Sequence, residues 1–121
     1  MGVSLSSGVM DIASYALDGL TRRAEARANN IANASTPGFR ATTIDFESTL
    51  RSRLLSGETE SLRDDPAMLE SIRPGFVSEN GNSVDLEQET TDMIQDNLMF
   101  QAVINGFNYK VGVIRTAIGT R

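Results

Sequence analysis

The chain of 121 residues contains no cysteine, no histidine and no tryptophan, and Lys110 is its only lysine. These absences exclude disulfide scaffolds, Cys/His zinc sites and every mechanism that needs a thiol nucleophile or an imidazole base. We therefore expect a protein that is not an enzyme, with no catalytic residue, no cofactor and no metal site. The formal net charge of −5 also argues against nucleic-acid binding, which needs a basic surface.

Long hydrophobic runs and targeting signals are missing as well. No stretch approaches the ~18 consecutive apolar residues of a membrane span, so we expect no membrane insertion. The first twenty residues contain no basic residue, and a cleaved signal peptide would need one at its start. The expected location is the cytoplasm, or outside it after export without signal-peptide cleavage.

A helical repeat of apolar residues opens the chain. The mean step of about 3.7 residues predicts a helix over residues 7–33, with Gly19 as one weak point. Residues 34–38 are expected to end it, because proline disfavours helical conformation in the residue before it. The apolar residues of the repeat are Val9, Ile12, Ala16, Leu20, Ala24, Ala28 and Ile31, and the opposite side carries Asp11, Asp18, Arg22 and Arg23.

The last third of the chain contains a heptad repeat, which is typical of a helix that packs along its length in a left-handed coiled coil. Thr90 and Asn97 are polar within it, and Ser83 is the expected N-cap of the helix. The residues predicted to pack against other helices or subunits are Leu86, Met93, Phe100, Ile104, Phe107, Val111, Ile114 and Ile118.

These patterns predict an all-α fold made of one structural domain. Its parts are an N-terminal helix with a turn (1–39), a flexible middle segment (40–82) and a C-terminal heptad helix (83–121). The two terminal helices are expected to pair as an antiparallel coiled-coil hairpin. The middle is expected to be loosely ordered or partly disordered, with one short helix around Asp45–Leu55.

Such a hairpin leaves apolar surface uncovered, because two helices placed side by side bury only one stripe each. Ile94, Leu98, Val103 and Val113 lie beside the heptad positions and widen the apolar face. This pattern indicates self-association or docking into a larger helical assembly. On pattern alone, a helical domain whose apolar residues form an internal core remains an equal alternative.

One segment resembles a family signature. Residues 28–39 read Ala-Asn-Asn-Ile-Ala-Asn-Ala-Ser-Thr-Pro-Gly-Phe, which is similar to the Asn-Asn-(Ile/Leu)-Ala-Asn…Thr-(Pro)-Gly-(Phe/Tyr) motif of bacterial flagellar axial proteins. Residues 82–87, 100–102 and 114–118 resemble the C-terminal end of the same family. The signature positions are Asn29, Asn30, Ile31, Ala32, Asn33, Thr36, Pro37, Gly38 and Phe39.

The resemblance implies a structural subunit of the flagellar basal-body rod, whose terminal helices line a tubular filament that transmits torque. The short middle segment is similar to proximal-rod subunits, with the B type the better match and the C type a close alternative. The implied location is the periplasm-spanning rod. Implied partners are other rod subunits, further copies of this chain, and basal-body ring or adaptor components.

The resemblance also implies export of the unfolded chain by the flagellar type III apparatus. Phe46 and Leu50 resemble the two fixed positions of the motif read at the export gate, although burial of Phe46 in a short helix would explain the pair equally well. A second class of function remains open at this point, a helical export chaperone or adaptor. A chaperone would stay in the cytoplasm, whereas a rod subunit would co-purify with basal bodies.

Overall fold

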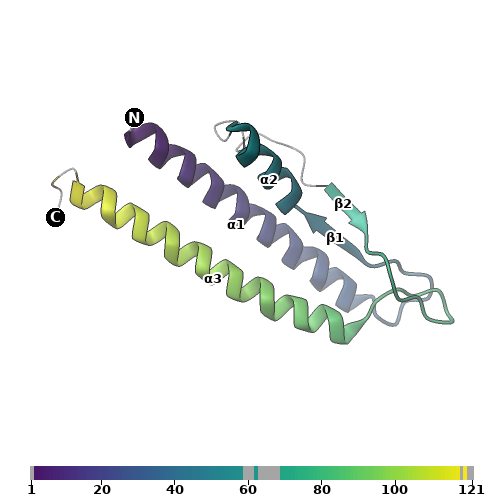
Figure 1. The fold of residues 1–121 in the computed structure, drawn as a ribbon. Helices are drawn as coiled ribbons and strands as arrows, with labels where there is room; N and C mark the ends of the chain where they lie inside the picture. The colour runs from purple at the N-terminus through teal and green to yellow at the C-terminus, as the bar shows by residue number, and fades with distance from the viewer. Residues whose placement is uncertain (1, 59–61, 63–68, 118, 120–121) are drawn as a thin grey trace.

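The computed structural model describes residues 2–58, 62, 69–117 and 119, with the backbone alone at residues 2–7, 69, 114 and 117. Two long helices, α1 and α3, lie side by side and run in opposite directions, while α2 and a small sheet lie along α1 (Figure 1). The elements are α1 (Gly2–Ala32), β1 (Thr42–Asp45), α2 (Glu47–Ser56), β2 (Leu69–Ile72) and α3 (Leu86–Ala117). The expected long terminal helices and short central helix are therefore present.

The sheet was not predicted. The prediction of an all-α fold is therefore right for the helices and wrong for the strands β1 and β2. The two strands pair antiparallel, with Thr42 opposite Ile72 and Asp45 opposite Leu69. Thr42, Thr43 and Ile44 are β-branched, and such residues favour strands. The middle segment is ordered at β1 and β2, which were not expected, and the short helix expected around Asp45–Leu55 is present as α2. Residues 59–61 and 63–68 lie outside the described part.

The buried face of α1 differs from the predicted one. Ala24 and Ala28 are exposed, whereas Arg23 and Arg27 are buried. Asp11, which was expected on the polar side together with Arg23, is buried too. Arg23 and Arg27 can be buried because the guanidinium group of each forms an ion pair with a carboxylate of α3.

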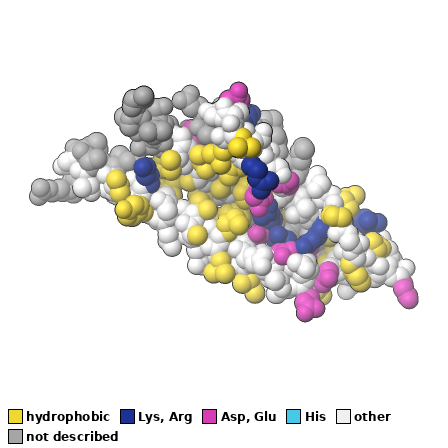
Figure 2. All heavy atoms as spheres, viewed as in Figure 1, with side chains coloured by type: hydrophobic (Ala, Val, Ile, Leu, Met, Phe, Trp, Pro, Cys, Tyr) yellow, Lys and Arg dark blue, Asp and Glu magenta, His cyan; other side chains and the backbone are white. Residues whose placement is uncertain are grey.

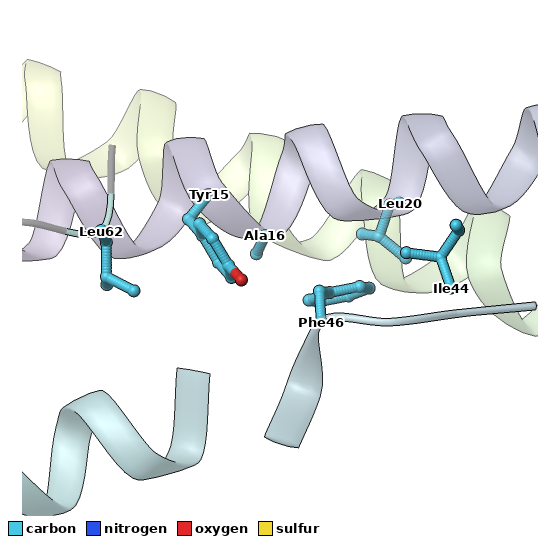
Figure 3. Packing of buried hydrophobic residues seen from close by; sticks show 6 residues of the cluster. All are labelled: Tyr15, Ala16, Leu20, Ile44, Phe46 and Leu62. Atoms are coloured by element: carbon cyan, nitrogen blue, oxygen red, sulfur yellow. The ribbon is translucent and has the colours of Figure 1, made fainter. Parts of the chain in front are cut away.

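A small hydrophobic core lies where α1 meets the end of β1 and the start of α2 (Figure 3). Phe46 packs against α1 at Gly19, where an added Cβ would lie 2.4 Å from the ring carbon Cγ of Phe46. Gly19 therefore makes room for an aromatic ring. From the sequence, Gly19 was expected only to weaken the helix. The six buried members of this core are Tyr15, Ala16, Leu20, Ile44, Phe46 and Leu62.

The start of α3 is capped by a different residue from the one predicted. The Asp85 carboxylate accepts the N–H of Gln88 at 3.1 Å, which satisfies one free donor of the first turn. Ser83 was the expected cap, but its hydroxyl oxygen instead accepts the N–H of Ala41 at 2.7 Å. Within the described residues, no helix is both long and apolar enough to cross a membrane.

Candidate subunit interface

The signature turn, defined as residues 29–39, is held by hydrogen bonds among its own polar side chains. Asn33 donates from Nδ2 to the main-chain oxygen of Asn29 at 2.8 Å, and Thr36 donates from Oγ1 to Oδ1 of Asn33 at 3.1 Å. Gly38 has a φ of 74°, a left-handed conformation that favours glycine. These residues end α1 and reverse the chain, as the sequence predicted.

Asn30 joins three elements from a fully buried position. Its Oδ1 accepts the N–H of Thr42 at 3.0 Å, and its Nδ2 donates to the main-chain oxygen of Thr42 at 2.8 Å. The same Nδ2 also donates to Oε1 of Glu89 at 3.1 Å. The side chain of Asn30 thus hydrogen-bonds both main-chain groups of Thr42 in β1 and also contacts α3. An amide suits this position because it can donate and accept at the same time.

Asn82 is a buried clamp that sequence reasoning missed. Its Nδ2 donates to the main-chain oxygens of Asn33 at 2.8 Å and Thr36 at 2.7 Å, and its Oδ1 accepts the N–H of Val84. The loop that carries Asn82 therefore docks on the signature turn. The sequence signal is the Asn-Gly-Asn-Ser run at 80–83, whose residue types favour a turn but give no indication of what the turn contacts.

Gly38 and Gly81 bring the two loops into close contact. The N–H of Gly38 donates to the main-chain oxygen of Asn80 at 2.9 Å. A Cβ added at Gly81, whose φ is 82°, would lie 3.3 Å from Cα of Gly38. The signature turn and the loop before α3 thus form one unit that closes the hairpin.

Beside this unit, three arginines and four carboxylates form a charged cluster between α1, α3 and the middle segment. Arg27 is its centre: Nε lies 2.6 Å from Oδ2 of Asp96, and Nη1 lies 3.4 Å from Glu89 and 3.5 Å from Asp92. The pairs run in opposite order along the two helices, as an antiparallel arrangement requires. The members of the charged cluster are Arg23, Arg27, Arg73, Glu47, Glu89, Asp92 and Asp96.

The outer arginines tie the middle segment to the helices. Arg23 donates to the main-chain oxygen of Ile44 at 2.8 and 3.0 Å, pairs with Glu47 and Asp96, and lies 4.7 Å above the ring of Phe46. Burial opposes the charge of Arg23, but these carboxylates outweigh it and raise its pKa above the usual value.

Arg73, just after β2, binds Glu89 at 2.9 Å and also pairs with Asp92. Burial acts to raise the pKa of Asp92, but the hydrogen bonds from Arg73 and Gln88 outweigh burial and hold that pKa below its usual value. Among the described residues, no group of three or more acidic side chains is arranged to hold a metal ion. The acids of the cluster serve as partners for arginines.

The predicted packing positions of α3 lie mainly beside its contact with α1. Glu89, Asp92 and Asp96 face α1 instead, and Val103 is a side chain of α3 that continues this face and packs on the core. Leu86 and Phe100 are exposed, and Met93, Ile104, Phe107 and Val111 are half-buried. The side chain of Ile114 and the whole of Ile118 lie outside the described part.

The two residues resembling the export-gate motif lie inside the fold. Phe46 is buried in the core, and Leu50 is half-buried against it. Beside them, a groove of about 450 Å³ opens between α1, α2 and α3. It is largely apolar, with Ile12, Val103 and Phe107 among its lining residues.

Comparisons with known proteins point to one family. A family model described as "Flagella basal body rod protein" matches residues 10–40, which include the whole signature turn. Three relatives, each named flagellar basal body rod protein FlgB, match over most of their length. The protein of Bacillus subtilis (strain 168) is 29% identical over 96% of this chain and 97% of its own length. The protein of Aeromonas hydrophila is 30% identical over 86% and 87%, and that of Salmonella typhimurium (strain LT2) is 34% identical over 71% and 75%.

Proposed function

Because the chain belongs to the flagellar basal body rod proteins of the FlgB type, we propose that it is a non-enzymatic structural subunit that polymerises into the proximal rod by helix packing. In this role its helices form part of the shaft that transmits torque. The geometry of α3 supports the proposal, and one property of that helix carries it.

That property is the distribution of exposed apolar side chains around α3. Leu86, Ile94, Leu98, Tyr109 and Val113 are all large, apolar and between 43% and 74% exposed. At 3.6 residues per turn these positions point in several different directions. A helix that is apolar on several sides is normally buried on several sides. A monomer covers one side of α3, so we infer that neighbouring subunits cover the others.

We propose that the heptad positions of α3 supply the main contacts with neighbouring subunits. Phe100 and Leu86 leave their side chains exposed, and the half-buried positions continue the same strip along the helix. The signature turn and the charged cluster would hold α3 in register with α1, so that the strip is presented in a fixed orientation. The partners are further copies of this chain, other rod subunits and the ring or adaptor components at the base.

Export through the flagellar type III apparatus forms the second part of the proposal. The unfolded chain would be threaded without cleavage and would then fold into the periplasm-spanning rod. Burial of Phe46 and half-burial of Leu50 are consistent with an export-gate motif that is readable only before folding. The hairpin would form after passage, when the charged cluster can close.

A substitution on the strip tests the rod assignment. Phe100→Glu places a charge on an exposed position, so melting followed by circular dichroism should stay within a few degrees of the wild type. The matched control is Gln101→Glu, which introduces the same group at the next exposed position. We expect the Phe100 variant to be absent from purified basal bodies and its cells not to swim, while the control assembles and swims.

Two results would overturn the proposal. If Phe100→Glu assembled and swam normally, the strip would have no role in packing. If the wild-type protein remained in the cytoplasm and never co-purified with basal bodies, a helical export chaperone or adaptor would explain the exposed strip better.

A further inference from the structure

Two exposed apolar patches lie at opposite ends of the hairpin. The first, which we call the loop patch, consists of Ile72 at the end of β2 and of Phe76 and Val77 in the loop that follows, and each side chain is about half exposed. Glu79 follows two residues later, on the exposed part of the same loop. In Figure 2, hydrophobic, acidic and basic side chains appear together at this end of the molecule.

The second patch, which we call the helix-end patch, lies near the C-terminal end of α3. Tyr109 is 74% exposed, and Val113 stands one turn further along the same face. Gly112 and Thr116 join them in lining a shallow hollow. Lys110, the single lysine of the chain, follows Tyr109, is half-buried and lines the neighbouring groove between α1, α2 and α3. Figure 2 shows a basic side chain beside hydrophobic ones at this end.

The two patches are separated along the molecule. The helix α3 begins at Leu86, next to the loop, and Tyr109 lies 23 residues further along it. A rise of about 1.5 Å per residue places Tyr109 roughly 35 Å from Leu86. The ribbon confirms that the loop before α3 and the C-terminal end of α3 occupy opposite ends (Figure 1). One copy cannot bring its own two patches together.

We propose that the loop patch of one copy docks on the helix-end patch of a second copy, so that subunits join head to tail. The inference rests on the proposed rod function and specifies how copies of this chain contact one another. Apolar surface meets apolar surface, and Glu79 of one copy approaches Lys110 of the next. An interface between two different patches repeats without closing when its rotation does not return to the start, and it then produces a filament.

The charges also disfavour the symmetric alternatives. Two loop patches in contact would bring Glu79 of each copy together, and two helix-end patches would bring together both copies of Lys110. Like charges juxtaposed in an interface cost free energy and suppress the wrong pairing. Head-to-tail docking is the arrangement in which both patches find an opposite charge.

The absence of native cysteine permits a direct test by disulfide trapping. The full-length double variant Phe76→Cys, Val113→Cys would replace the native copy in cells, and purified basal bodies would be oxidised and examined by non-reducing electrophoresis. We expect a ladder of dimers, trimers and longer species. The two single variants should each remain monomeric, and the matched control Ser14→Cys, Val113→Cys, which uses an exposed residue of α1, should form no ladder.

The outcomes separate this inference from the rod assignment. Dimers from either single variant would mean a symmetric contact, and basal bodies that contain the protein but give no ladder would mean a different contact; each overturns the inference and leaves the rod function intact. Absence of the wild-type protein from basal bodies would overturn both. Charge reversal provides a second measurement: Glu79→Lys and Lys110→Glu should each reduce swimming, and the two changes combined in one chain should restore it.

Discussion

The two halves of the contact between α1 and α3 are built from different chemistry. Near the signature turn, Arg27 meets three carboxylates, and buried Asn30 adds a hydrogen bond to Glu89. Toward the chain ends, apolar side chains such as Ile12 and Phe107 face an open groove. In one half the charged side chains are paired with one another, while the other half is mainly apolar and open.

This difference separates two tasks. Ion pairs and amide hydrogen bonds demand fixed geometry, and an unpaired buried charge is strongly unfavourable, so the polar half permits one register of the helices. Hydrophobic contact is not directional and accepts several partners. We interpret the polar half as the device that orients the hairpin and the apolar half as surface kept for contact with other subunits.

Removing the centre of the charged cluster should have the largest effect. Arg27→Met leaves three buried or half-buried carboxylates without their shared cation, and losing one partner of a buried pair costs about 3–5 kcal/mol. We expect urea unfolding to show this loss. Arg22→Met, on the exposed side of the same helix, should change the free energy of unfolding by less than about 0.5 kcal/mol.

A second substitution tests whether the loss of stability in Arg27→Met comes from the broken ion pair or from the changed packing of the side chain. Asp96 also pairs with Arg23, which keeps Glu47 as a second partner, so adding Asp96→Leu to Arg27→Met should cost less free energy of unfolding than the sum of the two single losses. If the two losses simply added, the Arg27–Asp96 contact would contribute no coupling, and the orienting role of the cluster would be wrong.

In the apolar half, Gly19→Ala should have the next largest effect. The new methyl group would overlap the ring of Phe46, and overpacking costs typically about 1–3 kcal/mol, which exceeds the gain of about 1 kcal/mol in helix propensity. The control is Gly106→Ala, where nothing lies within 4 Å of the added Cβ and the variant should be slightly stabilised. Phe46→Leu combined with Gly19→Ala should recover part of the loss; equal stability of the two glycine variants would contradict the packing described.

The same contrast explains what could be predicted from sequence. Helical periodicity located α1 and α3, and a proline-glycine turn located the end of α1, because both are local patterns. The inward position of Arg23 and Arg27 could not be read in this way, since it depends on carboxylates about 70 residues away. A charged residue is expected at the surface unless its partner is known.

The candidate site divides in the same way. The signature residues were predicted from a contiguous motif, and their hydrogen bonds are largely local. Asn82 was missed because its partners, Asn33 and Thr36, lie more than 45 residues earlier. The strands were missed because four residues each give a weak pattern, and β1 depends on Asn30 and Arg23 of α1 to satisfy its outer edge.

Acid should weaken the polar half before the apolar half. The pKa of Asp92 is lowered in the folded protein, so its contribution is fully present above the unfolded value of about 3.9 and is lost as the pH falls through the folded pKa. We expect the urea midpoint to stay level from pH 7 to about pH 5 and to fall below about pH 4. Asp92→Asn should make this fall shallower, and an unchanged pH profile would exclude Asp92 from the acid response.

The smallest effect is expected where a pair of the same type lies in solvent. Asp18 and Arg22 are 3.6 Å apart on consecutive turns of α1, with more than half of each side chain exposed. Water screens such a pair, and exposed pairs four residues apart contribute about 0.3–0.5 kcal/mol. Asp18→Asn should therefore lower the free energy of unfolding by no more than this amount, and 0.5 M salt should abolish the difference. A loss as large as that of Arg27→Met would mean that an exposed ion pair stabilises the fold as much as the buried charged cluster does. Burial and the number of partners around Arg27 would then not explain the strength of the cluster.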